Sequence, residues 1–504
     1  QDRGFYFLNS RHEGETLILE LGDPSHVSET VLTGAPDAIL RWDPKEFQGQ
    51  LLTPATLKSI AARVEEVLGT QGYACPELQT QADPTTGRID IHVSDAEKVV
   101  WADVEENKVK DLLPGTLRRY DAFRIGDPYD SEMLRLTTQR TIESGVVRNT
   151  FFNVHCKDGK AIAQQRIFAG KPRELRLGVG FNTDLGALLR AQWSHARLGP
   201  RGSKFSASLE ASYMGYLFNT QEAKLESQWY VLSQPSRFHL RPALTVRHES
   251  NNRGDTLTAT ARLNPTMTWD TRSAGYFVSV GPQLNGVRTF RGPGRLQSYF
   301  LAAELDFRVT SHEFELNRAA PQMGYEWTLT GSFSQKDILA DFSSEMLQTR
   351  FTWLIPSHRY GARKVIFGFR GGLSTTFVRQ SEGGISNLPT NLRHYLGGTT
   401  TLRGFGPREL PGPNGGLTSL FLGAEMRAAD YLPWGIQPLV FVDAGSVGTD
   451  AFSLDPTWYL SPGAGVRWQS PIGVFRATVA PGFALKSPVQ NHPVKFHFTY
   501  GEEF

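Results

Sequence analysis

The sequence of 504 residues is poor in cysteine and lacks long apolar runs. Its two cysteines, Cys75 and Cys156, are too few for a disulfide scaffold and are not spaced as zinc ligands. We expect two buried thiols, with a disulfide in an oxidising compartment as the alternative. No run of 18 or more uncharged apolar residues occurs, which excludes a transmembrane helix.

An excess of charge of one sign is also absent. The chain has 53 Lys and Arg against 51 Asp and Glu, a formal net charge of +2. This balance excludes a nucleic-acid binder that relies on a strong basic field. The sequence also lacks a hydrolase serine elbow, a P-loop and a HExxH zinc helix. We therefore predict no enzymatic activity, no cofactor or metal, and no small-molecule substrate.

Aromatic residues are plentiful by contrast, with 31 Phe, 15 Tyr and 10 Trp. Yet only 39% of the residues are apolar, and the mean hydropathy is −0.33. Composition alone indicates a soluble protein, and the aromatic content fits that interpretation poorly.

The sequence pattern changes near residue 171. Before that point we predict two small α+β units, at 26–98 and 99–171, each with a helix and a β-hairpin. Residues 1–25 contain a strand-like stretch and are left unassigned, with a remnant of a further unit as one interpretation. The expected elements are a helix from Thr53-Pro54 to Gly69, strands at Glu77–Gln81, Arg88–Val93 and Val99–Val104, a helix from Asp130 to Gly145, and a hairpin of Phe151–Cys156 and Ala161–Phe168.

From Arg173 to Phe504 no amphipathic helix is predicted, and apolar residues alternate with polar ones, as Leu305, Phe307 and Val309 do within Glu304–Thr310. This period suits either a soluble β-sandwich or an outer-membrane β-barrel. Three features favour the barrel: segments of about 10 residues, charges of both signs on the polar faces, and aromatic residues near segment ends. At roughly 20 residues per strand and connection, 172–504 predicts a membrane β-barrel of about 16 antiparallel strands.

A segment rich in Gly and Pro interrupts this pattern. Gly397–Phe405 carries Arg403 at its apex, and Gly and Pro recur as far as Gly416. So rigid a loop suits a chain folded back into a cavity, which we place at about 388–418. On the next two strands the alternation puts Glu425 and Asp443 on the polar face, where they are possible counter-charges for the arginine.

Several of these segments resemble the outer membrane protein 85 superfamily. Leu402-Arg403-Gly404-Phe405 resembles the signature of its inward-folded sixth extracellular loop. Phe441–Gly445, Gly463–Gly473 and Phe496–Gly501 resemble later barrel strands and the C-terminal assembly signal. Within the superfamily, Leu175–Gly186 and Gly126–Val154 resemble the first barrel strand and the last POTRA domain of TamA-like members, the barrel subunits of the translocation and assembly module.

The resemblance implies that the α+β units are POTRA domains and that Leu402, Arg403, Gly404 and Phe405 form the loop motif. It implies that Arg403 reaches into the lumen and pairs with Asp443, with Glu425 nearby. It also implies a lateral seam between the first and last strands, where a substrate strand can add. From the residues alone, the seam glycines more simply relieve crowding at a barrel corner. The seam residues are Leu175, Leu177, Gly178, Val179, Gly180 and Phe181 on the first strand, and Phe496, Phe498, Tyr500 and Gly501 on the last.

The implied function is the insertion or export of autotransporter-like β-barrel proteins through that seam. The implied place is the outer membrane of a Gram-negative bacterium, with the POTRA domains in the periplasm. The implied partners are unfolded outer-membrane proteins, the lipid bilayer and a TamB-like protein that spans the periplasm; nucleic acid is not expected.

Alternative functions remain open. TamA-like members have three POTRA domains, whereas this sequence accounts for two and a fragment. Two such domains fit a two-partner secretion transporter, which exports a β-helical protein through the barrel lumen. That class usually begins with a plug helix, and residues 1–24 show strand-like alternation instead. A passive porin and a soluble β-sandwich enzyme are further alternatives.

Overall fold

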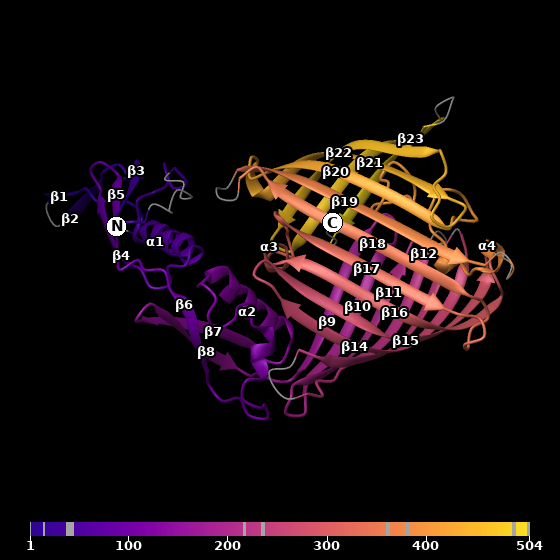
Figure 1. Ribbon diagram of the computed structural model, residues 1–504. Helices are drawn as coiled ribbons and strands as arrows, with labels where there is room; N and C mark the ends of the chain where they lie inside the picture. Colours follow the sequence, from indigo (N-terminus) through magenta and orange to yellow (C-terminus); the bar gives the residue numbers. More distant parts are fainter. Residues whose placement is uncertain are drawn as a thin grey trace.

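The computed structural model describes residues 2–13, 16–36, 45–214, 218–232, 237–251, 253–358, 363–379, 381, 384–485 and 490–500. Two small α+β units lie beside one end of a large β-barrel (Figure 1). None of the helices in these residues has the length and apolar content needed to cross a membrane.

The first unit is a three-stranded sheet covered by helix α1. The sheet has the order β3-β5-β4, and a separate hairpin of β1 and β2 precedes it. α1 begins where expected, because the Thr53 hydroxyl accepts a hydrogen bond from the Thr56 amide and Pro54 occupies the first turn. Its buried face, which includes Ile60 and Val64, packs on the β5 side chains. The bounds are β1 Leu8–Glu13, β2 Thr16–Leu21, β3 Glu29–Thr33, α1 Pro54–Gly69, β4 Glu77–Asp83 and β5 Arg88–Ser94.

The second unit repeats this plan with a sheet of order β6-β8-β7 and helix α2. The Asp130 side chain caps α2 by accepting a hydrogen bond from the Glu132 amide at 2.8 Å. Trp101 and Phe123 stack in its core, with ring centroids 4.2 Å apart. The helices and hairpins predicted for both units are confirmed to within a few residues. The bounds are β6 Val100–Glu106, a 3-10 helix Thr116–Tyr120, α2 Ser131–Glu143, β7 Asn149–Lys157 and β8 Lys160–Phe168.

A disulfide between Cys75 and Cys156 joins the two units, so the expectation of two buried thiols is wrong. Cys75 precedes β4 of the first unit, whereas Cys156 lies on β7 of the second and is exposed. The end of the first unit packs against the second, where the Gly72 carbonyl accepts a hydrogen bond from the Val99 amide at 3.1 Å. This packing brings together two cysteines that are 81 residues apart in the chain.

The barrel closes with sixteen antiparallel strands, β9 to β24, which confirms the predicted fold class. Each strand pairs with its sequence neighbour, and β24 returns to β9. The bounds are β9 Arg173–Asn182, β10 Gly186–Leu198, β11 Ser203–Tyr213, β12 Phe218–Gln228, β13 His239–Asn251, β14 Asp255–Asp270, β15 Ala274–Arg291, β16 Gln297–Ser311, β17 Gly324–Ser334, β18 Ser344–Pro356, β19 Lys364–Val378, β20 Thr418–Ala429, β21 Ile436–Gly448, β22 Trp458–Ser470, β23 Gly473–Leu485 and β24 Gln490–Tyr500.

The alternation read from the sequence separates the two faces of the barrel wall. On β21, Val440 and Val442 are exposed on the outside, whereas Phe441 and Asp443 are buried inside. Trp327 and Trp353 are likewise exposed on neighbouring strands. Large apolar side chains therefore face outwards on the barrel, and the charged side chains are held within it, as a barrel in lipid requires.

The barrel region contains a short helix that the sequence pattern did not predict. Helix α3 (His312–Leu316) connects β16 to β17 at the barrel end next to the α+β units (Figure 1). Its Phe314 is buried against Leu354, Ile366 and Ala429. A helix of five residues is too short to show a periodicity of 3.6. A second short helix, α4 (Gly384–Asn387), lies in the connection between β19 and β20.

Candidate functional site

The connection between β19 and β20 folds into the barrel through a tight turn at Gly397-Gly398. Both glycines have positive φ, +116° and +92°. A Cβ on Gly397 would lie 2.1 Å from the Gly406 carbonyl oxygen, and one on Gly398 would lie 2.4 Å from the Asp184 carboxylate. Only glycine fits these two positions, because they combine a left-handed backbone with close approach.

Two apolar side chains of the loop motif anchor the turn. Leu402 and Phe405 are fully buried and pack with Leu396, Leu410, Phe421 and Val447. Between them, a Cβ on Gly404 would lie 2.2 Å from the Pro481 carbonyl oxygen on β23. The loop motif therefore contacts the inner side of several strands, which fixes its depth in the lumen.

Arg403 makes the contact with Asp443 that the resemblance implies. Its Nε lies 2.7 Å from Asp443 Oδ2, and its Nη2 lies 2.8 Å from Oδ1, so the guanidinium forms a bidentate pair. Its Nη1 lies 2.7 Å from Glu425 Oε2. Arg403 is 2% exposed and Asp443 is 0% exposed. One buried arginine thus joins the loop to β20 and β21.

Three further residues complete this cluster and were not singled out from the sequence. Arg370 on β19 donates to Asp443 Oδ1 at 3.1 Å and to the carbonyls of Thr399, Thr400 and Thr401. Arg476 on β23 pairs with Glu425, and the Phe441 ring lies 3.3 Å below the Arg403 guanidinium. Alternation places these residues inside the barrel, but it does not say which of many inward residues meet across the lumen.

The same loop is tied to both strands of the seam. His497 Nε2 on β24 lies 2.8 Å from the Arg403 carbonyl oxygen, and His497 Nδ1 lies 3.4 Å from Asp184 Oδ1. Asp184 sits in the turn between β9 and β10, where its Oδ2 accepts hydrogen bonds from the Thr399 amide and hydroxyl at 2.6 and 2.8 Å. The loop and the seam are therefore connected by one continuous set of polar contacts. Neither Asp184 nor His497 was predicted from the sequence as a site residue.

Among the described residues, the seam between β9 and β24 has little pairing. Two residues of β9 are paired with β24, Phe181 with Tyr500 and Asn182 with Thr499, whereas β9 forms ten such pairs with β10. Leu177 and Val179 are more than 70% exposed, and Leu175 is 64% exposed. Most of the β9 edge that faces β24 thus lacks a partner strand among the described residues.

The other predicted seam residues have varied surroundings. A Cβ on Gly180 would lie 3.3 Å from the Tyr500 carbonyl oxygen, whereas one on Gly178 would make ordinary contact with Arg190. Phe181 and Phe498 approach with ring centroids 6.0 Å apart. Phe496 is exposed on the outer face of β24. Gly501 lies outside the described residues.

A second polar cluster fastens the second α+β unit to the barrel. Arg140 of α2 donates to Asp270 at the end of β14 and to Glu315 of α3, at 3.0 and 2.6 Å between Nη2 and a carboxylate oxygen. Arg237 also pairs with Asp270, and Arg124 donates to the Asp270 carbonyl at 2.7 Å. Asp270 is buried, so this cluster holds the unit firmly against the barrel rim.

Removal of the shared carboxylate should loosen this attachment. We expect Asp270→Ala to destabilise the docked arrangement by about 3 kcal/mol, because Arg140 and Arg237 lose their common partner in a buried site. Hydrogen exchange of the α2 amides measures the effect, since undocking exposes that helix. Asp306→Ala, which removes a carboxylate elsewhere in the barrel, is the matched control. Equal α2 protection in both variants contradicts the prediction.

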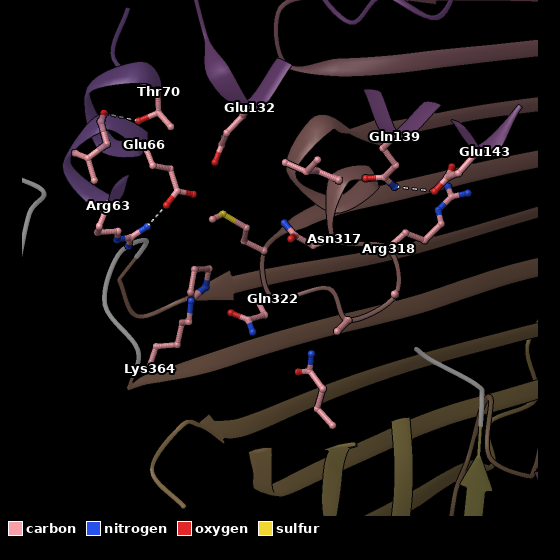
Figure 2. Close-up of a pocket in the computed structure, with 17 residues that line it drawn as sticks. Arg63, Glu66, Thr70, Glu132, Gln139, Glu143, Asn317, Arg318, Gln322 and Lys364 are labelled. Atoms are coloured by element: carbon pink, nitrogen blue, oxygen red, sulfur yellow. Dashed lines mark hydrogen bonds and ion pairs between the residues drawn. The ribbon is translucent and has the colours of Figure 1, made fainter. Parts of the chain in front are cut away.

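Beside this attachment lies a polar cavity of about 820 Å³. Figure 2 shows residues of α1 and α2 facing the segment that follows α3. Its lining mixes both charges with amide groups, and includes Arg63, Glu66, Glu132, Gln139, Glu143, Asn317, Arg318, Gln322 and Lys364. The cavity can therefore accommodate a polar polypeptide segment of either sign of charge. Within the described ranges, no cluster of three or more His, Cys, Asp or Glu is placed to hold a metal ion.

Comparisons with known proteins agree with this architecture. A family model described as the Omp85 superfamily domain matches residues 164–504. BamA from Haemophilus ducreyi lacking POTRA domains 1–3 is 17% identical, with a TM-score of 0.56 over 94% of this chain and 99% of that one. CdiB from Acinetobacter baumannii is 13% identical, with a TM-score of 0.52 over 94% and 89%. CdiB from Escherichia coli has the same identity and TM-score over 95% and 90%.

Proposed function

The chain belongs to the Omp85 superfamily, and from that premise we propose that it assembles or translocates proteins of the outer membrane through the seam between β9 and β24. Its substrates are unfolded outer-membrane proteins of the autotransporter type, and the lipid bilayer is its working surface. The barrel lies in the outer membrane of a Gram-negative bacterium, and the two α+β units act as POTRA domains in the periplasm.

The observation that carries this proposal is the short pairing at the seam. A β-strand without a neighbour presents a row of free N–H and C=O groups, to which an extended chain can add as a further strand. The edge of β9 from Arg173 to Gly180 has no partner on β24 among the described residues, while its other edge is fully paired with β10. Among the described residues, β9 is thus paired along its whole length with β10 and at two positions with β24, and the β24 side is the one that we propose opens to a substrate strand.

The polar cavity between α1, α2 and the barrel supports the proposal from the periplasmic side, because an unfolded chain meets a polar lining there. We further propose a TamA-like role with a TamB-like partner that spans the periplasm. This finer assignment is supported by the resemblance of Leu175–Gly186 and Gly126–Val154 to TamA-like members.

The second candidate is a two-partner secretion transporter that exports a β-helical protein through the lumen. Its support is the likeness in fold to the CdiB structures, which is nearly as high as the likeness to BamA. The inward loop does not separate these two candidates, because its motif belongs to the superfamily as a whole. A passive porin is less favoured, because a diffusion pore needs neither the α+β units nor a loop held in the lumen by Arg403.

A disulfide across the seam distinguishes these functions. The tether uses Phe181→Cys with Tyr500→Cys, which the register pairs directly. We expect oxidation to abolish the insertion of substrate into liposomes and reduction to restore it, because a closed seam cannot accept a strand. Both cysteines are introduced into the Cys75→Ser/Cys156→Ser variant, so that reduction opens no other bond.

The matched control places cysteines at Val179 and Leu189, which are paired between β9 and β10 away from the seam. That tether should leave insertion unchanged. Insertion that continues at the normal rate with an oxidised seam refutes the lateral route, and export through the lumen is then the better account.

A further inference from the structure

A small cavity inside the barrel has a lining suited to an anion. Its volume is about 270 Å³, and it lies between the wall strands β18, β19, β23 and β24 and the turn of the inward loop. Its polar lining consists of Arg350, Arg370, Arg403, Arg476 and His497 together with five threonines, two of them on the loop. No Asp or Glu lines it among the described residues.

The carboxylates near this cavity are already engaged. Asp443 accepts hydrogen bonds from Arg403 and Arg370, and Glu425 accepts from Arg403 and Arg476. Arg370, Arg403 and Arg476 thus meet these two carboxylates beside the cavity. Positive side chains that line a cavity favour the entry of an anion, since the lumen offers less screening than bulk water.

Arg350 adds a fourth positive charge. It lies on β18, with its inward direction set by alternation with the outward Phe351 and Trp353, and it is exposed to the lumen. Thr352, two residues further on, pairs with Arg370 on β19, so the two arginines are diagonal neighbours, roughly 7–8 Å apart at their Cα atoms. Arg350 forms no ion pair with any residue that the structure describes.

We propose that this cavity is a binding site for an oxyanion of the phosphate class. A phosphate has several acceptor oxygens pointing in different directions, which suits guanidinium forks and hydroxyl donors converging from separate elements. The cavity volume of about 270 Å³ leaves room for a phosphate group with some hydration.

Binding has a structural consequence for the loop. Thr399 and Thr400 belong to the inward loop, while Arg350 belongs to the barrel wall. An anion held between them adds a bridge to the one that Arg403 makes, so it stabilises the inward position of the loop. His497 and Thr499 of this lining lie on the seam strand β24, but anion binding does not depend on the proposed route of substrate.

The test titrates inorganic phosphate into the purified full chain in zwitterionic detergent and follows heat by calorimetry. We expect saturable binding to the wild type and about tenfold weaker binding to Arg350→Gln, which removes one charge-assisted contact. Arg308→Gln is the matched control, because Arg308 also faces the barrel interior but lines a different cavity near the α+β units. It should bind phosphate as the wild type does.

A second arm identifies the source of the phosphate group. Detergent micelles containing phosphatidic acid are compared with micelles containing phosphatidylcholine, each in competition with inorganic phosphate. If phosphatidic acid competes with inorganic phosphate and phosphatidylcholine does not, the site is assigned to a lipid headgroup. If neither lipid competes, the site is assigned to the free ion. Absence of binding to the wild type, or equal binding to Arg350→Gln, overturns the proposal, whichever result the seam tether gives.

Discussion

Arg403→Ala is expected to release the inward loop and to cost the barrel about 3–5 kcal/mol of stability, the usual penalty for removing one partner of a buried ion pair. The alanine leaves Asp443 with Arg370 and leaves Glu425 with Arg476, so two buried carboxylates lose their strongest shared donor. The ring of Phe441 also loses the cation stacked on it. Substrate insertion should fall by more than tenfold, because the loop supports both strands of the seam.

The measurement combines unfolding in urea with trypsin digestion of the folded protein. Arg393 is buried in the folded loop, so new cleavage after this residue reports release of the loop. Arg403→Lys keeps the charge but cannot form the bidentate fork, and it should give an intermediate loss. Arg308→Ala controls for the loss of an arginine elsewhere inside the barrel. A protected loop with normal insertion in Arg403→Ala contradicts the prediction.

The fold could be predicted because its signals are local and repeated. Caps at Thr53 and Asp130 predict the two long helices, and alternation predicts many of the barrel strands without knowledge of their neighbours. The same alternation placed Glu425 and Asp443 on the inner face. The choice of Arg403 as their partner, however, came from the resemblance of the loop motif, since nothing in the spacing of residues 403, 425 and 443 brings them together.

What the sequence did not reveal depends on contacts between distant segments. Arg370, Arg476 and His497 reach the cluster from three different strands, and closure of the whole barrel decides which inward residues meet. The disulfide is a similar case, because the packing of the two α+β units brings Cys75 and Cys156 together. The register at the seam, where Phe181 meets Tyr500, is likewise fixed by closure of sixteen strands and not by the sequence of either strand.

Asp184→Ala should separate the loop from the seam while leaving the Arg403 cluster intact. The substitution removes the acceptor for the amide and hydroxyl of Thr399 and the carboxylate beside His497. Hydrogen bonds to a charged group contribute about 1.5–3 kcal/mol each, so the loss of two predicts about 3–6 kcal/mol, confined to this corner of the barrel. Because β9 and β24 share two residue pairs among the described residues, a loss of that size is comparable to the pairing seen there.

The rate of disulfide formation between Phe181→Cys and Tyr500→Cys measures this effect directly, in the variant that lacks Cys75 and Cys156. With Asp184→Ala the seam should spend more time open, so cross-linking should slow about tenfold or more, while the loop stays protected from trypsin at Arg393. Asp184→Asn retains one acceptor oxygen, so its cross-linking rate should lie between those of the parent and Asp184→Ala. If cross-linking is as fast as in the parent, the pairs at Phe181 and Asn182 hold the seam without help from the turn. If trypsin also cleaves at Arg393, the loop has been released and the Arg403 cluster depends on Asp184. The loop and the seam then open together as one cooperative unit, which contradicts the expectation that Asp184→Ala affects the seam alone.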